Sequence, residues 1–255
     1  MREVPSIDEL RAVAQPERVL SRVNGEHWMG RRLRTISVYF SRAAIRFGIS
    51  ANTLTGVMIV VGLLSALAFS APGWWPLIGV LGIEVYLLLD CVDGEVARWN
   101  RAESAKGVYL DRLGHYVVEA AIPIGLGLRA ADWAINGWLV VGMTASIGVL
   151  VSKSETDLVD MARLHSGMTL MPEAAREMKP RGLASARRLV GMVPFHRIVH
   201  AVEASMLATA AFIADELTDS LDFTRGLVVA LAVAAGLTAV LHLISVLVSS
   251  RLTAD

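Results

Sequence analysis

The chain has 255 residues, of which 54% are hydrophobic, and its mean hydropathy of +0.52 is too high for an ordinary soluble domain. The 24 basic residues balance the 24 acidic residues, so the net charge indicates no nucleic-acid partner. The single cysteine, Cys91, excludes an intrachain disulfide and is expected to pack as a small apolar residue. The polar, Arg-rich N-terminal part shows no pattern typical of a cleavable signal peptide.

The N-terminal segment precedes any strongly apolar run. We predict that residues 1–25 form a peripheral helix or a loosely held arm, and we assign them no chemistry. Trp28–Phe47 has the pattern of an amphipathic helix, because apolar residues recur at steps of three or four while arginines lie towards the other face. The apolar positions are Met29, Leu33, Ile36, Phe40, Ala44 and Phe47. Such a helix lies in the membrane interface and attracts anionic lipid headgroups, whereas packing on a soluble domain is the alternative.

Six apolar runs follow, and Ser50 or Asn52 is the expected N-cap of the first. The runs are Leu54–Phe69, Trp74–Leu89, Val117–Leu128, Ala134–Val151, Ile198–Ala214 and Leu227–Val248. Runs two and three become long enough to span a bilayer if their helices continue into the polar segment between them, as Trp74–Trp99 and Gly107–Leu128. A soluble bundle with buried helices is the alternative, but six such runs are hard to bury in one soluble chain.

The sequence therefore predicts an all-α integral membrane protein with two parts. Residues 1–50 form a cytoplasmic N-terminal arm and an interfacial amphipathic helix, and residues 51–255 form a six-helix transmembrane domain. Of the 24 Lys and Arg residues, 22 lie before run one, between runs two and three, between runs four and five, or in the tail. Only Arg129 and Arg225 lie on the other side, so the positive-inside rule makes both termini cytoplasmic in a multi-pass cell-membrane protein.

The polar segment between runs two and three carries the pattern D-x2-D-G-x2-A-R-x8-G-x3-D-x3-H, from Asp90 to His115. Carboxylates this close to hydrocarbon are costly and usually mark a functional site. Asp90 and Asp93 share one helix face, as do Asp111 and His115 with Gly107. Two neighbouring helices can therefore aim three carboxylates and an imidazole at one point, and such ligands suit Mg²⁺ or Mn²⁺.

This pattern resembles the signature of the CDP-alcohol phosphotransferase family, which ends in aspartate where this chain has His115. The segment Ala51-Asn52-Thr53-Leu54-Thr55 also resembles the Pro-Asn-x-x-Thr motif at the start of the first helix in that family, with Ala51 in place of proline. Members are six-helix membrane enzymes that move a phospho-alcohol from a CDP carrier to a hydroxyl acceptor and release CMP. The resemblance implies a multi-pass transferase that contacts membrane lipids and forms a dimer.

The resemblance also implies roles for the individual residues of the signature. Asp90, Asp93 and Asp111 are expected to bind two metal ions that bridge the CDP phosphates. Small residues at Gly94 and Ala97, with Gly107 on the second helix, leave room for the nucleotide. Arg98 is expected to clamp a phosphate. Without the resemblance, Ala97 is a helix-packing residue, Arg98 is an interfacial anchor, and the carboxylates are capping or salt-bridging groups.

His115 departs from the family pattern, and three interpretations remain open. In the first, His115 is a general base that takes the proton from the acceptor hydroxyl, with Asp111 beside it in the catalytic centre. In the second, it contacts a metal or a phosphate. In the third, it marks a member with altered or lost chemistry. Lys153, Arg197 and His200 are candidates for holding an anionic acceptor, and membrane-interface anchoring is an equally good interpretation of them.

The leading function is therefore transfer of a phospho-alcohol from CDP-diacylglycerol or a CDP-polyol to a hydroxyl acceptor, in the synthesis of phospholipids or related lipids. Glu95 resembles the residue of members that use CDP-inositol. An ion-coupled transporter is the first alternative, although its charged groups are expected near the membrane midplane between inverted repeats. A non-catalytic relative that acts as a binding protein is the second.

Overall fold

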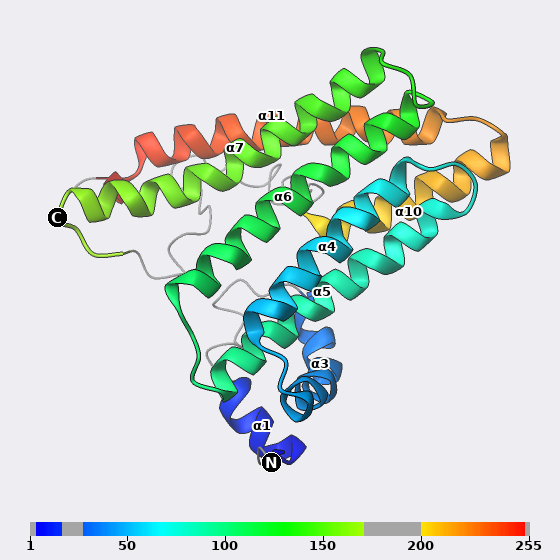
Figure 1. The fold of residues 1–255 in the computed structure, drawn as a ribbon. Coiled ribbons are helices and arrows are strands. Elements are labelled where there is room, and N and C mark those ends of the chain that lie inside the picture. The colour runs from blue at the N-terminus through cyan, green and yellow to red at the C-terminus, as the bar shows by residue number, and fades with distance from the viewer. Residues whose placement is uncertain (1–3, 17–27, 171–199, 253–255) are drawn as a thin grey trace. The chain divides into compact units, whose positions relative to one another are not determined.

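The computed structural model describes residues 4–16, 28–170 and 200–252, and these residues form helices without a strand (Figure 1). The all-α prediction is therefore confirmed for the described part of the chain. The elements are α1 (Ile7–Ala14), α3 (Trp28–Phe47), α4 (Ala51–Ser70), α5 (Trp75–Trp99), α6 (Ala105–Ala130), α7 (Gly137–His165), α10 (Ala201–Thr218), α11 (Asp222–Val248) and the short 3₁₀ helix η3 (Ser250–Leu252).

Each of the six predicted apolar runs overlaps one helix, from α4 to α7 and then α10 and α11, and the start of run five at Ile198 lies outside the described residues. Both α5 and α6 continue into the polar signature, as predicted. Within the described residues, the helices α4, α5, α7 and α11 are long and apolar enough to cross a membrane. Helices α6 and α10 fall short of that criterion, so the count of six spans stays a prediction.

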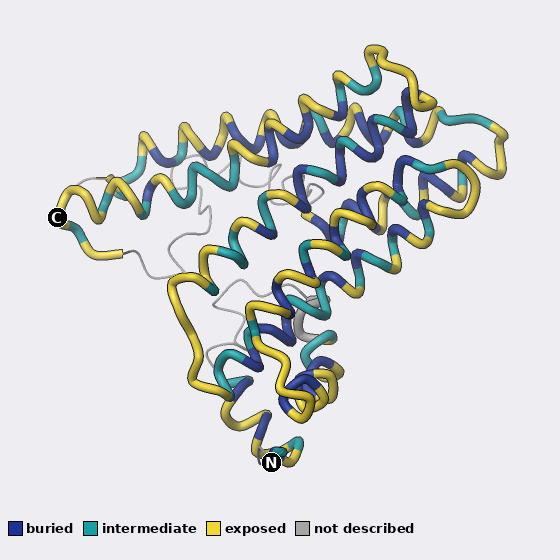
Figure 2. Tube along the Cα trace, viewed as in Figure 1, coloured by how far each residue is buried: buried dark blue, intermediate teal, exposed yellow. Residues whose placement is uncertain are grey.

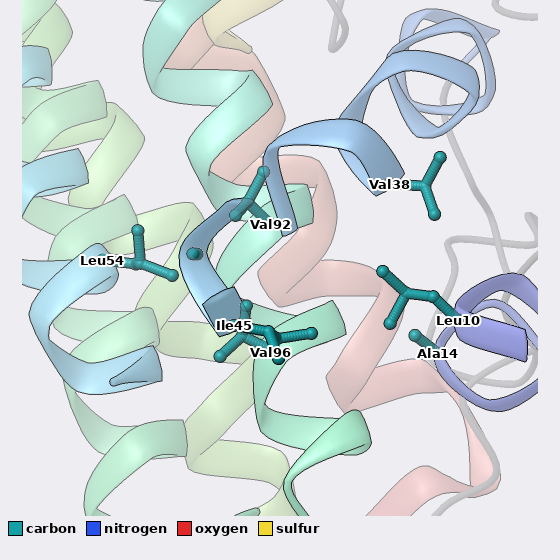
Figure 3. Packing of buried hydrophobic residues seen from close by; sticks show 8 residues of the cluster. Leu10, Ala14, Val38, Ile45, Leu54, Val92 and Val96 are labelled. Carbon is teal, nitrogen blue, oxygen red and sulfur yellow. The ribbon is translucent and has the colours of Figure 1, made fainter. Parts of the chain in front are cut away.

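The chain divides into two compact units, and α4, α5 and α6 contribute residues to both. Unit 1 comprises Met1–Ser65 and Leu81–Val118, and unit 2 comprises Ala66–Val80 and Glu119–Asp255. In unit 1, side chains from α1, α3, α4 and α5 form one hydrophobic cluster (Figure 3). Its buried members are Leu10, Ala14, Val38, Ala44, Ile45, Leu54, Val92 and Val96.

Helix α3 has the predicted bounds, but its core-facing side differs from the predicted apolar stripe. Val38 and Ile45 point into the cluster of unit 1, and they lie almost half a turn from the centre of the stripe, although Ala44 of the stripe also joins the cluster. Ile36, Phe40 and Phe47 of the stripe are exposed, by 50%, 51% and 75%. An interfacial helix needs such an uncovered apolar stripe, so the exposure supports the predicted membrane contact, which itself stays a prediction.

In unit 2, α7 packs along α11, and α10 also packs on α11. Buried and exposed segments alternate along these helices, as Figure 2 shows. Two contacts between ionisable side chains are largely enclosed in this unit: Lys153 Nζ lies 2.9 Å from Glu119 Oε1, and His242 Nδ1 lies 3.2 Å from Glu155 Oε2. Ionisable groups inside a helical bundle usually pair with one another, and these contacts tie α7 to α6 and to α11.

Candidate functional site

The start of α4 contributes two polar side chains to unit 1. The Ser50 hydroxyl accepts a hydrogen bond from the Thr53 amide at 3.1 Å, so Ser50 is the N-cap of the two candidates. One turn into the helix, Thr55 Oγ1 donates a hydrogen bond to Asp93 Oδ2 at 2.6 Å. Asn52 Oδ1 lies 3.4 Å from where a Cβ on Gly107 would stand. The start of α4 therefore packs against both halves of the signature.

Asp90, Asp111 and His115 come together from two helices, as the sequence predicts. His115 Nε2 lies 2.9 Å from Asp90 Oδ1 and 3.5 Å from Asp111 Oδ1. One potential ligand atom from each residue lies within 4.8 Å of the other two. The three side chains are partly exposed, by 33% for Asp90, 42% for Asp111 and 27% for His115. These residues form the candidate site, and they all belong to unit 1.

Asp93 lies beside this triad and is not one of the three converging groups. It is only 6% exposed, and its carboxylate binds the hydroxyl of Thr55. It remains close enough for electrostatic interaction with Asp90 and Asp111. A step of three residues turns a side chain about 60° around the helix axis, and the hydrogen bond from α4 holds Asp93 in that direction. The predicted group of four is therefore a triad with a buried third carboxylate beside it.

Tyr86 completes the surroundings of His115, and sequence reasoning missed it. Its hydroxyl lies 2.6 Å from His115 Nδ1, and the side chain is fully buried. Tyr86 precedes Asp90 by one helical turn and so shares its face of α5. This spacing is the sequence signal that could have identified it. A phenol can donate or accept, so this contact suits either tautomer of the imidazole. Both ring nitrogens of His115 are therefore held, one by Tyr86 and one by the carboxylates.

A strip of small residues continues along α5 from the triad. Gly94 and Ala97 follow Asp90 at steps of four and three, and both are partly exposed. The Arg98 guanidinium lies across Gly94, where an added Cβ would stand 3.1 Å from Nη1 and 3.3 Å from Nη2. Arg98 Nε donates a hydrogen bond to the carbonyl oxygen of Ala14 at 2.6 Å. A partly exposed surface of α5 made of small residues therefore lies directly beside the planar guanidinium of Arg98.

Glu95 points away from this surface, contrary to the expectation that it reports on the donor. It is fully buried. Its carboxylate accepts hydrogen bonds from Gln15 at 2.8 Å, Ser37 at 2.5 Å and Ser41 at 2.6 Å. Because these donors come from the N-terminal part of the chain and α3, Glu95 anchors those segments to the signature helix. The use of CDP-inositol, which its resemblance to other members indicates, stays a prediction.

The predicted acceptor residues are not assembled into a site within the described part of the chain. Lys153 is paired with Glu119, while His200 is exposed and precedes α10. Arg197 lies outside the described residues. The acceptor site stays a prediction.

The donor set of the triad fits a divalent cation that prefers oxygen ligands. It offers two carboxylates and one imidazole nitrogen, partly exposed and close together, with a third carboxylate alongside. Carboxylates with few nitrogen ligands suit Mg²⁺ or Mn²⁺. The residues present therefore meet the chemical requirement for metal binding that the signature predicts.

The comparisons with known proteins agree with this geometry. A family model described as CDP-alcohol phosphatidyltransferase matches residues 49–163, which include the whole signature and the start of α4. None of the curated proteins matches the chain. Residues 49–163 are therefore a CDP-alcohol phosphatidyltransferase domain, and the family is a transferase family.

Proposed function

We propose that this protein transfers a phospho-alcohol group from a CDP-alcohol to a hydroxyl acceptor and releases CMP. One observation carries the proposal: Asp90, Asp111 and His115 converge within a domain that matches the CDP-alcohol phosphatidyltransferase family. The donor is CDP-diacylglycerol or a CDP-polyol, and the product enters the synthesis of phospholipids or related lipids. The reaction takes place at the cytoplasmic face of the cell membrane, on the side where 22 of the 24 basic residues lie in the predicted topology.

The carboxylates are the proposed metal ligands. Asp90 and Asp111 would hold Mg²⁺ or Mn²⁺, and Asp93 would supply the third carboxylate of a two-metal site. Metal bound there would supply positive charge that offsets the diphosphate of the donor. Thr55 fixes the Asp93 carboxylate through its hydrogen bond, which keeps that charge beside the triad.

The donor lies along the small-residue strip of α5. Gly94 and Ala97 leave the helix surface free for the nucleotide, and Gly107 keeps the start of α6 clear on the other side. Arg98 places the terminal amino groups of its guanidinium over Gly94, where they contact phosphate oxygens. These residues bind and orient the donor and take no part in proton transfer.

His115 is the proposed base for the acceptor. The hydroxyl oxygen of the acceptor attacks the phosphorus atom of the phospho-alcohol, the bond to the CMP oxygen breaks, and the hydroxyl proton moves to His115 Nε2. Nε2 accepts a proton only when the ring hydrogen is on Nδ1, and the Tyr86 hydroxyl is placed to accept the hydrogen bond from that position. Asp111 lies 3.5 Å from Nε2 and stabilises the imidazolium. A purely ligating His115 is the alternative that the Discussion tests.

The test is release of CMP by the purified full-length protein in lipid. CDP-diacylglycerol, CDP-glycerol and CDP-inositol are supplied in turn with membrane lipids as acceptors and with Mg²⁺ or Mn²⁺. We expect CMP from one donor class, with loss of the signal in the Asp111→Asn variant. Binding of a CDP-alcohol without CMP release would instead indicate a non-catalytic relative. Failure to bind any of the three donors, together with cation transport into vesicles, would support the transporter.

A further inference from the structure

Glu95 is a buried carboxylate that the proposed reaction does not use. It is fully buried on α5 and directly follows Gly94 of the small-residue strip. Burying a carboxylate is costly unless it is hydrogen-bonded. Ser37 Oγ donates to Glu95 Oε1 at 2.5 Å, Ser41 Oγ donates to Oε2 at 2.6 Å, and Gln15 Nε2 donates to Oε1 at 2.8 Å. Because the two serines lie one turn apart on α3, Glu95 fixes the position of α3 along the signature helix.

Helix α1 belongs to the same N-terminal support. Its N-cap is Ser6, whose hydroxyl accepts a hydrogen bond from the Glu9 amide at 3.2 Å. Leu10 and Ala14 are fully buried in the hydrophobic cluster. Of the two forms predicted for the N-terminal residues, the described part of this segment is therefore a packed helix and not a loose arm.

Helix α5 carries the candidate site on one side and meets α3 on another. Asp90 and the small-residue strip share one side, because they follow one another at steps of four and three. Val92 and Val96 lie on the other side of α5. They belong to the hydrophobic cluster, to which α3 contributes Val38 and Ile45 (Figure 3). Helix α3 therefore supports the signature helix from behind the candidate site.

The surface of α3 that is turned away from α5 suits an anionic membrane. Its apolar stripe of Ile36, Phe40 and Phe47 is exposed, and so are Arg42 and Arg46. The helix contains five arginines and no acidic residue, so its attraction to negative charge does not depend on the hydrogen bonds of any one guanidinium. Helix α4, which is long and apolar enough to cross a membrane, begins a few residues after α3 ends. This short connection keeps α3 within reach of the membrane surface.

We propose that α3 couples the negative charge of the membrane surface to the candidate site. Anionic lipid headgroups bind its arginines and hold it on α5, and the contact with Glu95 passes this stabilisation to the signature. The direction of the effect follows from the geometry. While Ser37 and Ser41 bind Glu95, the apolar stripe and the arginines stay exposed, so lipid binding and docking on α5 favour each other. The consequence for catalysis rests on the proposed function: CMP release is faster on an anionic membrane.

The first test follows hydrogen exchange in the signature helix and needs no substrate. The full-length protein is placed in nanodiscs of phosphatidylcholine, alone or mixed with phosphatidylglycerol, and the peptide that covers residues 90–99 is followed by mass spectrometry. We expect slower exchange in the anionic discs. Arg46→Gln should reduce this slowing by about 5-fold, the factor that one basic residue contributes at an anionic surface. Lys106→Gln is the matched control, because Lys106 is an exposed basic residue on α6, and it should show the full slowing.

The second test separates coupling through Glu95 from a merely structural hydrogen bond. Ser41→Ala removes one donor to Glu95, adds no volume and leaves the arginines in place. A fluorophore on Phe40→Cys should still report membrane contact in this variant, and the chain's own Cys91 is buried. Exchange in the signature should then depend less on the lipid than it does in the wild type. A merely structural hydrogen bond would instead change exchange equally in both kinds of disc.

CMP release in the same discs gives the functional result. With the CDP-alcohol that the wild type uses, we expect faster release in the anionic discs. Arg46→Gln should lose about 5-fold of this increase, whereas Lys106→Gln should keep it.

Four results would overturn the inference. They are equal exchange of the wild-type signature in the two kinds of disc, a slowing that Arg46→Gln leaves unchanged, a slowing that Lys106→Gln reduces as much as Arg46→Gln does, and an effect of Ser41→Ala that is equal in both discs. Lipid-dependent exchange without CMP release from any donor would instead refute the proposed function and support the coupling, so the two failures are distinguishable.

Discussion

Replacing Tyr86 with phenylalanine should slow CMP release without weakening metal binding or unfolding the protein. The change deletes one oxygen atom from a fully buried side chain and keeps the ring that packs there. It removes the 2.6 Å contact with His115 Nδ1, so this ring nitrogen loses the partner that orients the imidazole and holds its ring hydrogen. A base that is no longer held in one orientation takes the acceptor proton less efficiently.

The magnitude follows from the hydrogen bond itself. Leaving a partly buried polar atom without its partner costs about 1–3 kcal/mol. At about 1.4 kcal/mol per factor of ten, this corresponds to a rate that is roughly 5- to 150-fold lower. We therefore expect the kcat for CMP release to fall by a factor of about 5 to 150.

The assay is CMP release by the purified protein with the CDP-alcohol that the wild type uses, and titration with Mn²⁺ checks that the metal site is intact. Tyr39→Phe is the matched control, because Tyr39 is 57% exposed on α3, whereas the triad lies on α5 and α6. A Tyr86→Phe protein that releases CMP as fast as wild type would refute the reasoning. It would show that the orientation of His115 does not depend on Tyr86, or that His115 is not the base.

Three further predictions concern the site and the topology. Asp111→Asn, or removal of divalent metals with EDTA, should lower CMP release by orders of magnitude in a folded protein, and activity that survives both would contradict the metal site. His115→Ala should lose ~10²–10⁴-fold in rate while binding the CDP-alcohol, and His115→Asp should keep part of the activity; loss of donor or metal binding would instead make His115 a ligand. A cysteine at Ile135, which is 95% exposed, should react with an impermeant thiol reagent outside intact cells, whereas one at Ala102 should not. The reverse labelling would place the signature on the wrong side of the membrane.

Periodicity and spacing in the sequence were enough to determine the helices and the centre of the site. The six apolar runs each overlap one helix, and α5 and α6 extend into the signature, as the length needed for a bilayer span predicted. The meeting of Asp90, Asp111 and His115 also followed from spacing, since residues three or four apart share a helix face. The helix positions depend on the sequence of one helix at a time. The triad requires only that two neighbouring helices turn their polar faces towards each other.

The partners of each side chain were decided only by the packing of the helices. Asp93 turns to Thr55, Glu95 to the N-terminal segments, and Tyr86 to His115. The contact between α1 and α5 could not be predicted either, because Arg98 donates there to a backbone carbonyl, a group that every residue type possesses. Helical periodicity determines which residues lie on a common face, but the neighbour that covers this face depends on packing between segments far apart in the chain. Polar side chains then take whichever partner that packing brings within hydrogen-bond distance.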